Sequence, residues 1–339
     1  MIFFCYNYFM KTIKFTLILH TPWSKFPSKE NLDNATDEKF IEIIKNFSEE
    51  YHLFKCGNLC NIFINNNNQI KIDFLHDETN ETNVRELIMI IVYYVSILNG
   101  YNCKLENNCE IDNNLIENFF NFPKEDESNF SVFKDIKFYE ISLESIKNDF
   151  GNHIFNLYSN PNRKFILTLL SNYYSTVFYK DFFGNLEFEF RNTIVNLESI
   201  ISIIKKEDYK NIKEENKEKM KKFGGKNLKS CAAPINISLK DKLQDLFKLF
   251  ESLFNVEFKK NLNKECEKIA NTRNFISHLF EDQKECLNDN EISMYNNVLP
   301  DVFRMLFLYY LNLDKNFIKI SFFKNQIIRR KMLTIFNMK

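Results

Sequence analysis

Short stretches of alternating apolar and polar residues mark the first part of the chain. A two-residue period is typical of half-buried strands, and Lys11–Thr21 shows it clearly. Leu53–Phe63 and Gln69–Leu75 are also rich in strand-forming residues, and they flank the polar Asn65–Asn68 segment, which suits a turn. We therefore expect strands in these stretches, with a hairpin around the asparagine run.

Two helices are expected among these strands. Asp37–Tyr51 places apolar residues at helical spacing, and Asn83–Asn99 is a strongly apolar helical stretch that ends before Gly100. Residues 1–158 are therefore predicted to form a mixed α/β domain.

A helical period replaces the alternation in the second half of the chain. The predicted helices are Arg163–Tyr179, Glu187–Lys206, Leu239–Phe254, Glu257–Phe280 and Glu291–Leu313, in each of which apolar residues recur every three or four positions. Ser238 is a suitable N-cap for the third of them. Residues 159–339 are predicted to form an all-α bundle of four to five main helices, which makes the whole chain an α+β protein.

One segment interrupts the helical half. Glu207–Lys229 is dense in Lys, Glu and Asn around Gly224 and Gly225, and it carries few apolar residues. Residues 207–234 are therefore predicted to be a mobile insertion in the bundle.

Composition adds an asymmetry between the two halves. Apolar residues make up 45% of the chain, enough for packed cores and too many for a disordered protein. Residues 1–160 carry 14 Lys or Arg and 23 Asp or Glu, a net charge of −9, whereas residues 161–339 carry 31 and 22, a net charge of +9. A basic half suits a polyanionic partner. Charges that merely solvate helix faces would give the same imbalance.

No segment has the pattern of a membrane span or a secretory signal. Met1–Met10 is apolar but lacks a preceding basic region and a small-residue cleavage site, and Met10 is itself a candidate start. Leu87–Leu98, the most apolar internal run, is too short to cross a bilayer. We expect a cytoplasmic protein without a membrane partner.

The cysteines raise a zinc hypothesis. The spacing of Cys56 from Cys60 and of Cys103 from Cys109 would allow a four-thiolate site, but tight paired knuckles are missing. Reduced, buried thiols are the preferred interpretation. We predict no metal site and no cofactor.

The residues suited to chemistry lie in the predicted helix Glu257–Phe280. Arg273, Asn274 and His278 fall within six residues, and His278 is the only histidine after residue 160. On a helix, Asn274 and His278 lie one turn apart and about 40° around the axis, so their side chains can touch. The long Arg273 side chain can reach the same side from about 140° away.

These residue types meet the needs of RNA cleavage by internal transfer. Histidine titrates in the range suited to a general acid or base, and the guanidinium binds phosphate oxygens. The nucleophile is the 2′-hydroxyl of the RNA, so the reaction needs no metal and DNA is not a substrate. Spacing alone does not decide this, because Arg and His recur on helices by chance and a helix C-terminus favours histidine without catalysis.

The run Thr272-Arg273-Asn274-Phe275-Ile276-Ser277-His278 resembles the Arg, polar residue, spacer, His signature of HEPN domains, in particular of the ApeA-like branch. The resemblance extends over roughly residues 160–315. It includes a helix with Leu197 and Glu198, a variable insertion, the motif helix and an apolar final helix. HEPN domains are helical-bundle ribonucleases of phage-defence and toxin systems. The acidic residues Glu281, Asp282 and Glu285 after the motif do not suit RNA binding unless they point away.

The resemblance implies an endoribonuclease with Arg273 and His278 as catalytic residues and Asn274 in support. It also implies a homodimer in which two motifs face one RNA, in anti-phage defence through abortive infection. The N-terminal domain is expected to sense a phage-derived trigger or to regulate. The alternative is a non-catalytic helical module that dimerises or binds a partner in a toxin–antitoxin or defence system.

Overall fold

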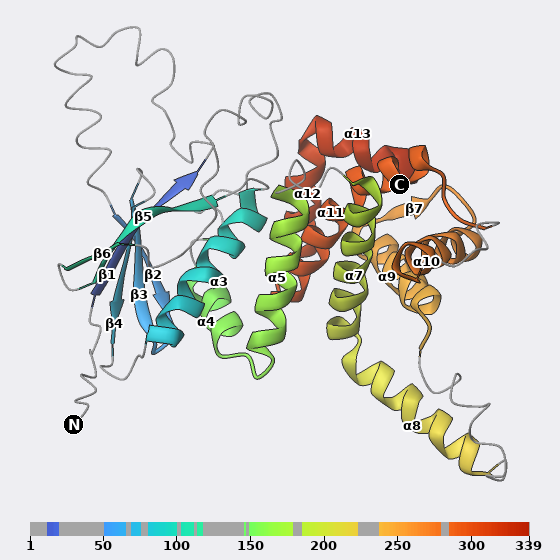
Figure 1. Cartoon of the computed structure of the whole chain (residues 1–339), viewed down its shortest axis with the longest axis horizontal. Helices are drawn as coiled ribbons and strands as arrows, with labels where there is room; N and C mark the ends of the chain where they lie inside the picture. The colour runs from blue at the N-terminus through green and yellow to red at the C-terminus, as the bar shows by residue number, and fades with distance from the viewer. Residues whose placement is uncertain are drawn as a thin grey trace, which may run out of the picture. The chain divides into compact units, whose positions relative to one another are not determined.

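The computed structural model describes residues 12–19, 51–65, 69–75, 81–99, 103–111, 114–117, 146, 149–178, 185–222, 237–278 and 285–338 (Figure 1). The chain divides into two compact units, Met1–Ser171 and Asn172–Lys339. Within the described residues, the first unit combines a sheet with helices and the second is mostly helical, so the predicted α+β class is confirmed. No described helix combines the length and apolarity needed to cross a membrane.

The first unit contains an antiparallel sheet with the strand order β2-β3-β4-β1-β5-β6. Its strands are β1 Thr12–Leu19, β2 Tyr51–Cys56, β3 Cys60–Asn65, β4 Gln69–Phe74, β5 Cys103–Ile111 and β6 Asn114–Glu117. Antiparallel pairing of β3 with β4 confirms the predicted hairpin. The prediction of one strand over Leu53–Phe63 is wrong, because the chain turns between β2 and β3 at Gly57, whose φ of 53° is disfavoured for other residues.

Two apolar helices accompany this sheet, α3 (Glu81–Asn99) and α4 (Phe150–Tyr158). Both contact strands of the same unit, α4 at β2 and α3 at β5 (Figure 1). Close approach of α4 depends on Gly151, since a Cβ there would lie 2.0 Å from the backbone oxygen of Lys55. The predicted Asn83–Asn99 helix is thus confirmed. The predicted Asp37–Tyr51 helix lies outside the described residues except for Tyr51, the first residue of β2.

The helices of the second half follow the predicted apolar periods closely. They are α5 Arg163–Phe178, α7 Leu186–Ile204, α9 Leu239–Phe254, α10 Leu262–His278 and α11 Asp289–Tyr310, followed by α12 Lys315–Lys324 and α13 Gln326–Ile335. Ser238 is the N-cap of α9 as predicted, with its Oγ accepting a hydrogen bond from the Asp241 N–H. The division between the compact units falls within α5, whereas the apolar pattern suggested a boundary just before it.

Two small strands change the expected start of the motif helix. Asn255, with a left-handed φ of 52°, ends α9, and β7 (Val256–Phe258) then pairs with β8 (Phe336–Met338). Helix α10 therefore begins at Leu262, not at residue 257. Phe336 packs against Phe247, Phe250 and Phe258, which fixes the end of the chain to the α9 region.

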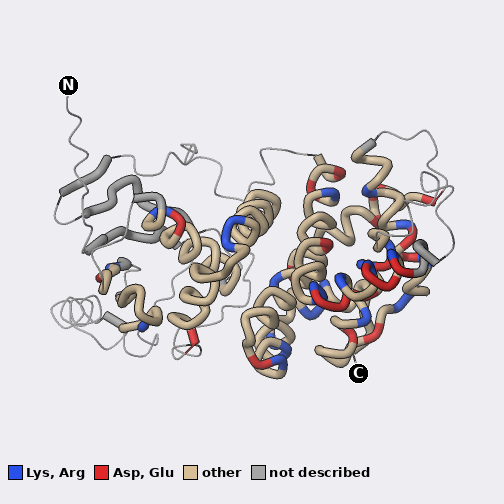
Figure 2. Tube along the Cα trace, turned by 90° about the horizontal axis from the view of Figure 1, so that it is seen from below, with Lys and Arg blue, Asp and Glu red and all other residues tan. Residues whose placement is uncertain are grey.

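The charge-dense segment, predicted to be a mobile insertion from residue 207, begins as a helix. Helix α8 spans Lys206–Lys222, because Lys and Glu are good helix formers even without an apolar stripe. Tyr209 is buried and donates a hydrogen bond to Asp245 of α9 at 3.1 Å. Residues 223–234 of the predicted insertion lie outside the described residues. Figure 2 shows Lys and Arg interspersed with Asp and Glu along the helices of the second unit.

Candidate active site

Helix α10 carries the predicted motif and packs on α9 and α7. Ion pairing of Lys240 with Glu267 at 2.7 Å and a hydrogen bond from Gln244 to Asn263 at 2.6 Å set α10 antiparallel to α9. Ile269 of α10 is fully buried. The motif is therefore built on a helix whose position and rotation are fixed by its neighbours.

Arg273 lies at the edge of this core with a side chain that is 25% exposed. Its Nη1 donates a hydrogen bond to the Asn274 Oδ1 at 3.2 Å, so the first two motif residues contact each other directly. Its Nη2 lies 3.9 Å from Oε2 of Glu198 on α7. The Nε of Arg273 is buried without a hydrogen-bond partner among the described residues. The guanidinium is thus oriented by Asn274 and Glu198, while part of the Arg273 side chain stays exposed.

Glu198 joins a second cation to this group. Lys242 of α9 donates to the Glu198 Oε1 at 2.7 Å, while the other carboxylate oxygen faces Arg273. One carboxylate therefore lies between two cations that come from two other helices. Since the formal charge of the three groups is +1, their shared surface suits an anion such as a phosphate.

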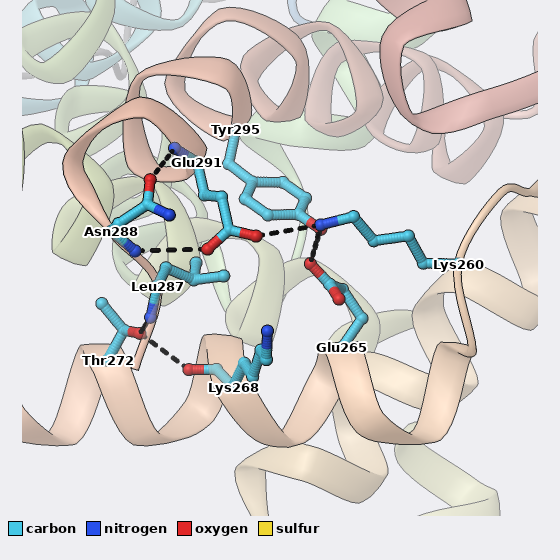
Figure 3. Close-up of polar contacts among 8 residues, drawn as sticks. All are labelled: Lys260, Glu265, Lys268, Thr272, Leu287, Asn288, Glu291 and Tyr295. Atoms are coloured by element: carbon cyan, nitrogen blue, oxygen red, sulfur yellow. Dashed lines mark hydrogen bonds and ion pairs between the residues drawn. The ribbon is translucent and has the colours of Figure 1, made fainter. Parts of the chain in front are cut away.

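Thr272, the residue before Arg273, fastens the motif to the start of α11 (Figure 3). Its side chain is buried, donates to the backbone oxygen of Lys268 at 2.7 Å and accepts from the backbone N–H of Leu287 at 2.8 Å. This hydroxyl joins the motif turn of α10 to the segment that enters α11. It is a positioning contact, one residue from the guanidinium.

A buried carboxylate strengthens the same junction (Figure 3). Glu265 of α10 accepts a hydrogen bond from the Tyr295 hydroxyl at 2.8 Å, and Lys260 bridges Glu265 and Glu291 at 2.9 and 3.0 Å. Burial, and then the hydrogen bond to the Glu265 carboxylate, raise the pKa of Tyr295 well above its usual range. Burial opposes the charge of Lys260, yet its two carboxylate partners outweigh this and raise its pKa. This network fixes α10 against α11.

His278 is the last residue of α10, and Arg273 and Asn274 precede it by five and four positions. The imidazole of His278 lies outside the described part of the structure, so its predicted approach to Asn274 stays a prediction. Ser277 Oγ is buried and has no hydrogen-bond partner among the described residues.

The strand order is incompatible with one zinc site shared by four cysteines. Cys56 and Cys60 lie on β2 and β3, while Cys103 and Cys109 lie on β5, with β4 and β1 between them. Three inter-strand steps of ~4.8 Å separate β3 from β5 by about 14 Å, too far for ligands of one ion. Hydrogen bonding with Cys56 and burial also raise the pKa of the Cys60 thiol, which disfavours the thiolate. Among the described residues, no group of three or more His, Cys, Asp or Glu side chains could hold a metal.

Comparison with protein families gives this site its context. Residues 189–317 match the family model described as Apea-like HEPN. The chain contains an ApeA-like HEPN domain. The match runs from the first turn of α7 to the first turn of α12 and includes Arg273, Asn274 and His278. No curated protein and no solved structure matches the chain.

Sequence reasoning placed the motif on a helix of the HEPN domain but missed most of its surroundings. Glu198 was noted only as a landmark of the resemblance, and Lys242 gave no signal, because their pairing joins residues 44 positions apart. Thr272 belongs to the motif run, but the sequence alone assigns it no structural role. The position of a threonine directly before the motif arginine is the sequence signal that could have pointed to this contact between α10 and the segment before α11.

Proposed function

We propose that the HEPN domain is a metal-independent endoribonuclease. The observation that carries the proposal is the partly exposed Arg273 guanidinium, which contacts Asn274 and lies near the Glu198 carboxylate that also binds Lys242. Arg273 and His278 both lie within the match to the Apea-like HEPN family, whose members are generally ribonucleases.

The proposed chemistry is transfer of a phosphate within the RNA. The 2′-oxygen attacks the adjacent phosphorus while a general base removes the 2′-proton. The bond from phosphorus to the 5′-oxygen breaks, and a general acid protonates that oxygen. The products are a 2′,3′-cyclic phosphate and a 5′-hydroxyl. His278 acts as an acid or base, and Arg273 stabilises the charge on the phosphate.

One HEPN domain offers a single imidazole, whereas the reaction needs both a base and an acid. We propose that two copies of the chain bring two motifs to one RNA and supply both groups. The resulting loss of RNA would arrest growth, which fits anti-phage defence through abortive infection, with the N-terminal region as the sensing or regulatory part. These roles follow the HEPN resemblance.

The direct test is cleavage of total RNA by purified protein in the presence of EDTA. We expect Arg273→Ala and His278→Ala each to lower the rate by ~100-fold or more, the scale of a lost acid, base or charge-stabilising group. Arg191→Ala is the matched control, since Arg191 is an exposed arginine of α7 in the same domain. Equal cleavage by all four proteins would contradict the catalytic assignment.

Two further readouts separate cleavage from binding alone. RNA with a 2′-deoxynucleotide at the cleaved position should resist cleavage, and the products should carry cyclic phosphate ends. In cells, expression of the wild type should arrest growth, and expression of His278→Ala should not. Arrest by both proteins without RNA cleavage would favour a non-catalytic binding module.

A further inference from the structure

The last helices of the chain carry a concentrated positive charge. Residues 315–339 contain seven Lys or Arg and no Asp or Glu. These residues form α12, α13 and β8, and all but the first three lie beyond the match to the HEPN family. The charge is therefore a property of this chain that the family match does not account for.

The charged side chains of these helices point away from the core. Ile318 and Phe322 of α12 and Ile328, Met332 and Ile335 of α13 are buried. The cations Lys315, Lys324, Arg329 and Arg330 are exposed, and Lys319 is half-exposed. None of these five forms an ion pair with a described residue. Lys315 and Lys319 are also one helical turn apart, where like charges repel. A bound polyanion would relieve this repulsion.

A hollow of about 580 Å³ lies at the start of the same surface. Its lining includes Lys315 together with Tyr309 and Tyr310 from the end of α11. Asp314 also lines it, but its carboxylate already caps α12 by accepting from the Phe317 N–H at 2.8 Å. Aromatic rings beside cations are the usual elements of single-stranded nucleic-acid sites, where bases stack and phosphates pair.

We infer that α12 and α13 form a binding surface for single-stranded RNA, with phosphates along the cations and a base in the tyrosine-lined hollow. The choice of RNA rests on the proposed ribonuclease function of the same unit. Ile320 is 52% exposed and Ile327 is 36% exposed between the cations, an arrangement that also suits anionic lipid. The aromatic hollow favours RNA over lipid, and the experiment includes both.

The test measures binding of fluorescein-labelled oligouridine to full-length His278→Ala protein across a salt series. Under the proposed chemistry this background does not cleave, and gel analysis of the recovered oligouridine checks that the probe stays intact, so binding is read whether or not His278 is catalytic. We combine Lys319→Gln, Lys324→Gln, Arg329→Gln and Arg330→Gln in one variant. The matched control removes four exposed lysines from α8, where acidic residues are interspersed. They are Lys206, Lys210, Lys213 and Lys217, each changed to Gln.

We expect the α12–α13 variant to bind ~10-fold or more weakly, with the slope of log affinity against log salt reduced by about 0.7 per lost phosphate contact. The α8 control should bind oligouridine with an affinity within about twofold of that of the His278→Ala parent, because its lysines lie among carboxylates. Tyr309→Leu should weaken binding about fivefold or more without changing the salt slope, since it removes stacking and no charge.

Several results would overturn the inference. They are equal weakening by both four-charge variants, unchanged binding by the α12–α13 variant, or no binding of oligouridine by the parent protein. Sedimentation with phosphatidylserine vesicles that is lost only in the α12–α13 variant, with RNA binding unchanged, would assign the surface to lipid. Loss of cleavage by Arg273→Ala with RNA binding retained bears on the proposed chemistry alone, so the two proposals fail separately.

Discussion

The two compact units bury polar groups in very different ways. Among the described residues of the first unit, the buried polar side chains are Ser96 and His153, and the surroundings are apolar. The second unit buries two acids and a base, Glu265, Asp301 and Arg304, besides several amides and hydroxyls. The first unit therefore depends mainly on close apolar packing, whereas the second also depends on hydrogen bonds and ion pairs of buried side chains.

This difference matters because the polar contacts of the second unit surround the motif. A buried charge persists only where it is paired, as Asp301 is with Arg304 at 3.1 Å. On α10, Glu265 is paired in the same way with Tyr295, and the Thr272 hydroxyl, next to Arg273 in the sequence, accepts from the Leu287 N–H. Stability and positioning of the site are thus coupled in the second unit. In the first unit, packing can be disrupted without touching any motif residue.

The largest expected effect separates the two units. Gly151→Ala places a Cβ within 2.0 Å of the Lys55 backbone oxygen, and neither α4 nor β2 can move without losing apolar contacts. We expect the first unit to lose ~3 kcal/mol or more of unfolding free energy. Hydrogen exchange followed by mass spectrometry should show faster exchange in α3 and α4, with α9 to α11 unchanged.

The matched control is Asn156→Ala, an exposed position on the same helix, where a change within about 0.5 kcal/mol is expected. If Gly151→Ala accelerates exchange equally in α9 to α11, the units unfold together. The contrast between them would then not extend to their stability.

A smaller effect is expected at Thr272, with a functional consequence. Thr272→Val keeps the shape of the side chain but leaves the buried Leu287 N–H without its acceptor, which costs about 1–3 kcal/mol. The turn that carries Arg273 loses its anchor, so RNA cleavage should fall more than the fraction of unfolded protein explains. Circular dichroism and the cleavage assay measure the two quantities.

Thr176→Val is the control for this change. Thr176 is also buried and donates to the carbonyl one helical turn before it, at 2.7 Å, but among the described residues its hydroxyl has no hydrogen bond to a second element. The difference between the two variants isolates the Leu287 contact. Equal losses of stability and of cleavage in both variants would show that Thr272 has no positioning role.

The separation of contacting residues along the chain decides what the sequence could predict. In the second half, the bounds of α9 and the Ser238 cap follow from a strong apolar period and one residue type. The three-residue strands β7 and β8 could not be found this way, because they pair residues about 80 positions apart and are too short to show a period. The late start of α10 follows from that pairing.

The candidate site divides along the same line. The helix that carries Arg273, Asn274 and His278 was predictable from local pattern, and the contact of Arg273 with Asn274 joins neighbours in the chain. The carboxylate between Lys242 and Arg273 was not, because it requires α7, α9 and α10 to meet. The catalytic roles of Arg273, Asn274 and His278 remain predictions, tested by the cleavage assay.

The smallest predicted effect concerns His153, the buried histidine among the described residues of the first unit. Burial lowers the pKa of His153, although nearby Asp149 partly offsets this, and its Nδ1 is hydrogen-bonded to the Tyr94 hydroxyl at 2.6 Å. Unfolded His153 takes up a proton near pH ~6.5, whereas folded His153 stays neutral to lower pH. The unfolded state then binds more protons, so the contribution of neutral His153 to the stability of the first unit is present in full above pH ~6.5 and is lost as the pH falls below it. Hydrogen exchange of α3 and α4, corrected for intrinsic rates, should show that the unfolding free energy of the first unit falls by at most about 1.4 kcal/mol per pH unit.

His153→Gln should remove this pH dependence from the first unit, while the second unit keeps its own pH dependence. The same slope in the variant would mean that another group in the first unit carries the titration.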